Sequence, residues 1–328
     1  MSDQMIEKER LASMGVEIIG LGHYLPKRKV LNEEILSSIT LKASSVDDKV
    51  LGNIGVESRY WANEEETVVY MAKEAAKMAI DMAQIKAEDI DLLLLTNWTS
   101  RETIPDLAPQ VALQLNAHNA LAFDLCTACC GFIHAVTTAC MYLLSHPRMQ
   151  TAVVACSEQF SKCVRPHSKG ELITGDAAGA VVLKKSNNKV NGIIDFDLRS
   201  DGRLSYVVGV KKPEIWVRSK PELATVAAEK NKEAVNYIFS RNDLKVEDID
   251  WFVPHPGTER VHEEIKEYIG LPDEKFVINF KEVANTSSAS IPLVLSINYH
   301  NGKFKKNDLI LSPAIGSGLY YGALLFRL

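Results

Sequence analysis

The chain is 328 residues long, enough for two fused domains or for one large α/β unit with a substantial core. Hydrophobic residues make up 46% of it and charged residues 24%, which is the balance of an ordinary soluble globular protein. The net charge of −5 and the pI near 6.0 argue against a nucleic-acid-binding surface. Residues 1–15 are charged and contain no apolar run, so we expect no secretory signal.

Short apolar runs rich in β-branched residues alternate with helical stretches along the chain, a pattern typical of layered α/β proteins. The apolar stretch 130–144 is interrupted by His134 and two threonines, which indicates a buried helix and not a membrane span. The polar, turn-rich segment 185–220 marks the predicted junction between two halves of the chain. We predict helices over 67–84 and 222–241 and strands over 16–21, 120–125, 151–156, 177–183, 275–279, 308–312 and 321–327.

A weak internal repeat divides the chain near its middle. Residues 87–95 read AEDIDLLLL and residues 246–254 read VEDIDWFVP, so the two copies are separated by about half the chain. The shift that carries position 87 onto position 246, the repeat offset, also carries Cys126 onto Asn285, so the segment CTACCGF pairs with the segment NTSSASIP. We therefore predict two tandem α/β halves related by duplication, residues 1–185 and residues 186–328.

All six cysteines lie in the N-terminal half, at positions 126, 129, 130, 140, 156 and 163. A disulfide scaffold would spread them through a small secreted chain, so we expect reduced thiols in a cytoplasmic protein. The spacing Cys126-x-x-Cys129 also occurs in zinc and redox sites. No second pair at ligand spacing follows it, and we expect no metal.

Three segments place reactive side chains where predicted strands end. Cys129 in DLCTACCGF precedes an apolar helix, whose dipole is expected to lower the pKa of the thiol and whose free N–H groups can hold an oxyanion. His255 leaves the repeated strand in WFVPHPGTERV, and Asn285 opens NTSSASIP at a strand-to-helix turn. Singly, these residues have structural explanations as a buried thiol, a structural histidine and a helix N-cap. At matching places in a duplicated fold they form a Cys-His-Asn set.

These segments resemble the motifs of the β-ketoacyl-ACP synthase III family, condensing enzymes of the thiolase fold. DLCTACCGF is similar to the family's nucleophile motif, and GDAAGAVVL at 175–183 follows it. VPHPGTERV is similar to the histidine motif, ANTSSASIP at 284–292 to the asparagine motif, and GSGLYYGALLFRL to the C-terminal strand-loop-strand. The order and spacing match from about residue 16 to the end. The resemblance implies an α/β fold in which two duplicated halves form a layered αβαβα structure.

The resemblance also implies an acyltransferase. Cys129 would accept an acyl group, and His255 and Asn285 would stabilise the enolate formed when a malonyl or β-ketoacyl thioester condenses with it. The backbone N–H groups of Cys129 and Ser317 would hold the acyl oxyanion, although the family usually has Gly at the position of Ser317. The substrates would be thioesters of coenzyme A or acyl carrier protein. The resemblance further implies a homodimer, no cofactor, no nucleic-acid or membrane partner, and a role in fatty-acid or secondary-metabolite biosynthesis.

The sequence departs from the family where coenzyme A is held. Aligned on Gly55 and Arg59, Lys49 and Asn53 stand where family members carry a Trp that stacks on adenine and an Arg that binds phosphate, and Lys169 replaces a further Arg. The histidine motif, commonly HQAN, is HPGT here. We assign Lys49, Asn53 and Lys169 to binding of the thioester or its carrier; the alternative is that Lys49 and Lys169 are only solvated surface charges. We hypothesise that the acyl group arrives on a carrier protein or as an unusual thioester, in a specialised pathway.

Ile104 aligns with an aromatic residue that, in the family, reaches across the dimer into the partner's acyl pocket. Loss of the ring is expected to enlarge that pocket and to admit a longer or branched acyl chain. The alternative is that Ile104 packs in the core of its own chain.

Three other functions stay open. A related acyltransferase would form an ester or an amide, with Cys129 as acyl carrier and His255 as general base. A reaction like that of HMG-CoA synthase needs a glutamate near the cysteine, and Glu102 and Glu158 are the nearest in sequence. The third is a non-catalytic subunit of a heterodimer. An intact Asn285 favours condensation over the first, and the retained cysteine argues against the last.

Overall fold

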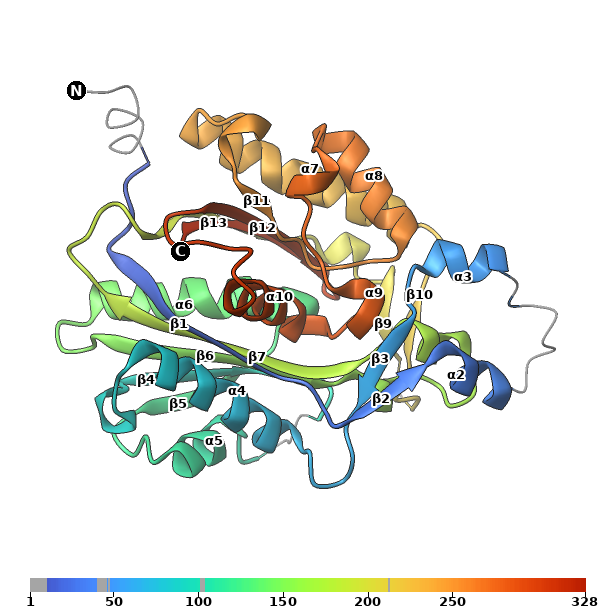
Figure 1. Cartoon of the computed structure of the whole chain (residues 1–328), viewed down its shortest axis with the longest axis horizontal. Coiled ribbons are helices and arrows are strands. Elements are labelled where there is room, and N and C mark those ends of the chain that lie inside the picture. The colour runs from blue at the N-terminus through green and yellow to red at the C-terminus, as the bar shows by residue number, and fades with distance from the viewer. Residues whose placement is uncertain (1–10, 40–45, 47, 101–103, 212) are drawn as a thin grey trace.

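The computed structural model describes residues 11–39, 46, 48–100, 104–211 and 213–328. Two β-sheets alternate with three layers of helices (Figure 1). The predicted layered αβαβα arrangement of two similar halves is therefore confirmed.

The N-terminal sheet has the strand order β1-β7-β6-β4-β5. Strand β4 pairs in parallel with β5 and β6, whereas β7 pairs antiparallel with β1 and β6. Every residue of β4 and β6 is buried, as expected for strands covered by helices on both faces. The strands are β1 Val16–Tyr24, β4 Leu92–Thr96, β5 Leu121–Leu125, β6 Thr151–Gln159 and β7 Asp176–Lys185.

The C-terminal sheet has the order β11-β12-β13-β8, which repeats the first sheet without its fifth strand. The strands are β8 Gly192–Ser200, β11 Trp251–Phe252, β12 Leu309–Gly316 and β13 Tyr320–Arg327. The strand predicted over 275–279 is wrong. This segment makes a single parallel bridge between Phe252 and Phe276, because β11 is only two residues long and offers no longer partner. The segment 185–220, predicted as a turn-rich junction, contains turns but also the nine residues of β8 and two shorter strands.

Helices α6 and α10 lie between the two sheets, α4 and α5 cover the outer face of the first sheet, and α7 and α8 cover that of the second (Figure 1). Residues 128–145, which include α6, are long and apolar enough to cross a membrane, yet 56% of this stretch is buried inside the protein. This burial confirms the predicted core helix. The bounds are α4 Val68–Ala83, α5 Ala108–Leu115, α6 Gly131–Ser145, α7 Leu223–Asn242, α8 Glu259–Ile269 and α10 Ser290–His300.

Smaller elements surround the two sheets. Strands β2 and β3 form an antiparallel pair, as do β9 and β10. Their bounds, with those of the short helices, are β2 Arg28–Leu31, β3 Ser58–Trp61, β9 Val208–Val210, β10 Val217–Ser219, α2 Asn32–Ser38, α3 Asp48–Ile54 and α9 Phe280–Val283.

The repeat offset recurs in the backbone. Ala128 has φ 48° and Ser287 has φ 55°, and each opens a 3₁₀ turn directly before α6 or α10. Non-glycine residues rarely adopt this left-handed conformation, so its occurrence at equivalent places supports the duplication. The boundary between residues 185 and 186 stays a prediction, since one hydrophobic cluster unites both halves, for example Val136 and Leu293.

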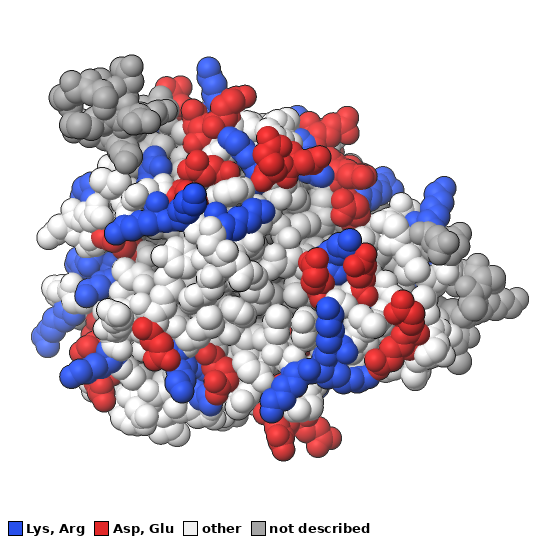
Figure 2. Space-filling model, viewed as in Figure 1, with Lys and Arg blue, Asp and Glu red and all other residues white. Residues whose placement is uncertain are grey.

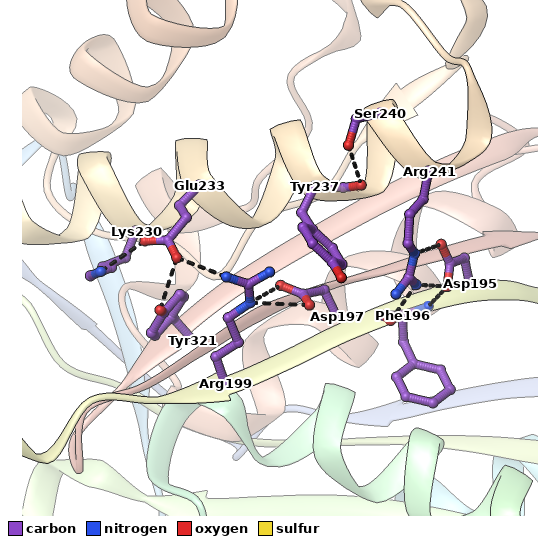
Figure 3. Close-up of polar contacts among 10 residues, drawn as sticks. All are labelled: Asp195, Phe196, Asp197, Arg199, Lys230, Glu233, Tyr237, Ser240, Arg241 and Tyr321. Atoms are coloured by element: carbon purple, nitrogen blue, oxygen red, sulfur yellow. Dashed lines mark hydrogen bonds and ion pairs between the residues drawn. The ribbon is translucent and has the colours of Figure 1, made fainter.

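A row of charged and aromatic side chains fixes α7 to β8 and β13 (Figure 3). Glu233 accepts hydrogen bonds at 3.0 Å from both Arg199 and Tyr321, and Arg241 pairs with Asp195 near the end of the helix. Acidic and basic side chains are intermingled over α7 and α8 (Figure 2). Exposed ion pairs contribute only about 1 kcal/mol or less each, but together they fix the orientation of the helix.

Strand β1 packs so closely on α4 that its glycines have no room for a side chain. A Cβ atom on Gly22 would collide with the backbone oxygen of Ala75. We predict that Gly22→Ala lowers the free energy of unfolding by about 1–3 kcal/mol, because the backbones must separate. Urea or thermal unfolding measures this. The control is Gly52→Ala in α3, where a Cβ meets no atom within 4 Å. Equal stability of Gly22→Ala and the wild type would contradict this packing.

Candidate active site

One cavity of about 700 Å³ has Cys129, His255, Asn285 and Ser317 in its wall. These residues come from four distant segments and from both halves of the chain, and the structure brings them together as the sequence predicted. The rest of the wall is largely apolar and includes Trp98, Phe160, Val164, Val217, Ala224 and Val261.

Cys129 lies in the 3₁₀ turn Ala128–Cys130, directly before α6. The backbone of Gly316 approaches this turn so closely that a Cβ atom there would lie 3.0 Å from the amide nitrogen of Cys129. Ser317 follows, its backbone lies outside the left-handed region, and its hydroxyl donates to the Val208 carbonyl at 2.7 Å. Serine is therefore accommodated at this position without the conformational freedom of glycine.

The predicted lowering of the Cys129 pKa is wrong. Burial raises the pKa of this thiol to about 12, and the negative charge of Glu158 acts in the same direction. A hydrogen bond with the Ser287 hydroxyl, at 3.3 Å from the sulfur, opposes the rise. Loss of hydration of the thiolate outweighs the interactions that favour it. The Cys129 thiol is thus neutral at neutral pH.

His255 is buried, and its backbone N–H donates to the Pro313 carbonyl on β12 at 2.9 Å. Burial lowers the pKa of its imidazole to about 3, and the nearby His262 acts in the same direction. A hydrogen bond to the backbone of Ser287 opposes this shift. The ring is therefore neutral at physiological pH and can offer one N–H donor.

Asn285 connects the two halves beside the cavity. Its backbone N–H donates to the Ile173 carbonyl at 2.8 Å, which ties the segment after α9 to the N-terminal half. Its side-chain oxygen accepts the Ser287 N–H at 2.8 Å, and its amide nitrogen lies 3.4 Å from the Pro256 carbonyl. These contacts fix the direction of the amide group.

Two residues at the site were missed by sequence reasoning. Ser287 contacts the sulfur of Cys129, and its hydroxyl accepts the indole N–H of Trp98 at 2.7 Å. Trp98 also packs edge-on against Phe160, with ring centroids 5.2 Å apart. The repeat offset pairs Ser287 with Ala128, the neighbour of Cys129, and could have drawn attention to Ser287. Trp98 carries no comparable signal beyond its place two residues after β4.

The other predicted site residues do not join this cavity. Lys49 and Asn53 are exposed on α3. Lys169 is half-buried and does not line the cavity, although its neighbour Gly170 does. The side chain of Ile104 is 86% exposed, so the alternative that it packs in the core of its own chain is wrong. Its insertion into a partner's pocket stays a prediction.

Two glutamates were considered above for a reaction like that of HMG-CoA synthase. Glu102 lies outside the described residues. Glu158 is buried away from the cavity wall and accepts the Ser288 hydroxyl at 2.5 Å and the Thr99 hydroxyl at 2.9 Å. Burial raises the pKa of Glu158 to about 7.

Cys126 is a free thiol in the cavity wall. Within the part of the chain that the structure describes, no three His, Cys, Asp or Glu residues are arranged to hold a metal ion.

Comparison with known proteins places this geometry in a family. The model of the 3-oxoacyl-[acyl-carrier-protein] synthase III domain matches residues 123–202, and that of its C-terminal domain matches residues 239–328, together more than half of the chain. The β-ketoacyl-[acyl-carrier-protein] synthase III of Ehrlichia canis is 35% identical over 319 residues, which cover 95% of this chain and 98% of that protein.

Solved structures agree with this placement. The crystal structure of the 3-oxoacyl-[acyl-carrier-protein] synthase III of Aquifex aeolicus matches with a TM-score of 0.90 and 32% identity, covering 96% of this chain and 100% of that one. The priming β-ketosynthase of the R1128 polyketide pathway matches with a TM-score of 0.87 and 25% identity, covering 95% and 96% of the two chains. The thiolase fold expected from the sequence motifs is confirmed. The chain belongs to the β-ketoacyl-[acyl-carrier-protein] synthase III family of condensing acyltransferases.

Proposed function

We propose that this acyltransferase joins an acyl group held on Cys129 to a malonyl or β-ketoacyl thioester by decarboxylative Claisen condensation. The observation that carries the proposal is the cavity whose wall contains Cys129, His255, Asn285 and Ser317. The relatives named β-ketoacyl-ACP synthase III and the polyketide priming ketosynthase support a role in fatty-acid or secondary-metabolite biosynthesis.

In the first step, the sulfur of Cys129 attacks the carbonyl carbon of an acyl thioester. The new bond is a C–S bond to Cys129, the donor's C–S bond breaks, and the leaving thiolate takes up the proton of the Cys129 thiol. The oxyanion that forms on the way is held by the backbone N–H groups of Cys129 and Ser317. The largely apolar wall of the cavity disfavours the water that would hydrolyse the acyl-enzyme.

In the second step, a malonyl thioester loses carbon dioxide and becomes an enolate. The ring N–H of His255 and the amide of Asn285 donate to the enolate oxygen, and the carbanion attacks the acyl carbonyl. The C–S bond to Cys129 then breaks, the β-ketoacyl thioester leaves, and the thiolate takes up a proton. The chemistry uses thioester substrates and needs neither a metal nor a redox cofactor.

The ionisation of His255 favours condensation over ester or amide formation. An imidazole whose pKa is about 3 is a weak general base, whereas a neutral ring is a good hydrogen-bond donor to an enolate. The retained nucleophile and its cavity likewise favour an active enzyme over a non-catalytic heterodimer subunit.

The acyl donor is proposed to be a carrier-protein thioester in preference to coenzyme A. Lys49 and Asn53, which replace the family's stacking Trp and phosphate-binding Arg, lie exposed on α3 and offer neither interaction. A partly exposed Lys169 lies beside the cavity, and an exposed Lys220 lies in its wall. The free state of all six cysteines supports the proposed cytoplasmic location.

We further propose a homodimer formed through β5. This strand is the edge of the N-terminal sheet, and its Leu121 is 45% exposed. Leu113 on the neighbouring α5 is 64% exposed, and Ile104 lies exposed in the segment that leads to α5. An apolar edge strand is a template for pairing with a second copy about a two-fold axis.

Acyl loading is the first prediction from this function. An acyl-carrier thioester should add one acyl mass to the wild type and none to Cys129→Ala. Acetyl-coenzyme A should load at least about tenfold more slowly, because the lost stacking and bidentate contacts weaken its binding. Intact-mass spectrometry over time measures both rates. Loading by acetyl-coenzyme A at the carrier-donor rate would exclude the carrier preference.

Variants of the two proposed enolate donors should distinguish acyl loading from condensation. We predict that His255→Ala and Asn285→Ala still load the acyl group but release carbon dioxide from a malonyl thioester about 10²–10³-fold more slowly, the typical loss for one oxyanion donor. Cys126→Ala, which alters the same cavity wall, should leave this rate within about twofold. If His255→Ala abolished loading as well, its assignment to the second step alone would fail.

The dimer is testable in solution. Leu121→Glu should convert the dimer to a monomer because it places charge on the proposed interface. Leu31→Glu on β2, where the leucine is 51% exposed, is the matched control and should stay dimeric. Sedimentation velocity gives the masses. A wild type that is monomeric at micromolar concentration would contradict the proposal.

A further inference from the structure

Ser287 interacts with several residues of the active site, and the proposed mechanism gives it no role. Its Oγ lies 3.3 Å from the sulfur of Cys129 and 2.7 Å from the indole nitrogen of Trp98. Its N–H donates to the side-chain oxygen of Asn285, and its backbone acts to raise the pKa of His255. One buried serine therefore interacts with all three members of the Cys-His-Asn set.

Trp98 determines how the Ser287 hydroxyl is used. An indole N–H can only donate, so the Ser287 oxygen is the acceptor in that hydrogen bond. The hydroxyl keeps its own hydrogen, and among the contacts of the described residues the Cys129 sulfur is the acceptor within its reach. A thiolate cannot donate, so once Cys129 has lost its proton the hydrogen bond must run from Ser287 to sulfur.

The backbone holds Ser287 in the position that this contact needs. Its φ of 55° is unfavourable for a residue with a side chain, and the chain adopts it because Asn285 accepts the N–H at 2.8 Å and Ser290 donates to the carbonyl at 2.9 Å. The equivalent position in the other half is Ala128, which has the same conformation but carries no hydroxyl. Of these two equivalent residues, only Ser287 presents a hydroxyl donor to the nucleophile.

We propose that Ser287 is a further catalytic residue, whose hydroxyl donates a hydrogen bond to the Cys129 sulfur whenever that sulfur carries negative charge, and that Trp98 is its positioning residue. This rests on the proposed function of Cys129. The charge develops twice: as the thiol gives up its proton on attacking the donor, the proton ending on the leaving thiolate, and as the acyl C–S bond breaks after condensation. The Ser287 proton stays on its oxygen throughout. Burial makes the thiolate costly, and this donor offsets part of that cost.

The test measures thiolate reactivity directly, by iodoacetamide alkylation of Cys129 between pH 7 and 10. A Cys126→Ala background and peptide mass spectrometry isolate the signal of Cys129. Because the thiol pKa lies above this range, the parent rate should rise about tenfold per pH unit without a plateau. Ser287→Ala and Ser287→Gly should slow alkylation about 10- to 100-fold at each pH, as expected for loss of a hydrogen bond to a charged group. The glycine variant suits the left-handed backbone and keeps the test valid if the alanine variant does not fold.

Trp98→Phe keeps the ring packed against Phe160 but removes the N–H, and it should slow alkylation by a smaller factor of about 3 to 10. Ser157→Ala, which removes a buried hydroxyl that bonds the Val68 carbonyl, is the control and should match the parent. Alkylation of Ser287→Gly within twofold of the parent rate would overturn the role of Ser287. An unchanged rate in Trp98→Phe would overturn that of Trp98. Failure of the proposed function is distinguishable, because the wild type would then alkylate normally but would not load an acyl group.

Discussion

Two 3₁₀ turns, one from each half and each directly before a central helix, pack against each other. Gly131 opens α6 so close to the second turn that a Cβ atom would lie 2.8 Å from that of Ser288 and 2.9 Å from that of Thr96. This approach is possible because residue 131 has only hydrogen in place of a side chain. It brings the sulfur of Cys129 to 3.3 Å from the hydroxyl of Ser287, and the site follows from that contact.

Burial determines the chemistry that this contact supports. The same loss of water raises the pKa of the Cys129 thiol and lowers that of the His255 imidazole, so both groups are neutral at physiological pH. A neutral pair suits an enzyme that must develop negative charge on sulfur and on an enolate oxygen at separate moments. In the proposed mechanism, fixed donors at Ser287, His255 and Asn285 meet each charge where it forms, without reorganisation of water.

Much of the fold and the three principal site residues could be predicted because their signals are local or repeated. Apolar runs located β6, β7 and β12, and the repeat offset paired the turns at Cys129 and Asn285. β8 was missed because its alternation of apolar and polar residues lies in a polar, Gly- and Asn-rich segment. The predicted strand over 275–279 does not form, because a strand needs a neighbour of similar length and β11 has only two residues. The pKa of Cys129 and the contact between Trp98 and Ser287 depend on tertiary burial, which no local pattern contains.

A single-turnover reaction of preformed acyl-Cys129 enzyme with one equivalent of malonyl thioester tests the central claim most directly. Quenched samples report acyl mass on the protein, carbon dioxide released and thioester product formed. Condensation at Cys129 predicts that one carbon dioxide and one β-ketoacyl thioester appear for each acyl group lost, with matching rates. Loss of the acyl group as free acid, ester or amide, without carbon dioxide, would contradict it.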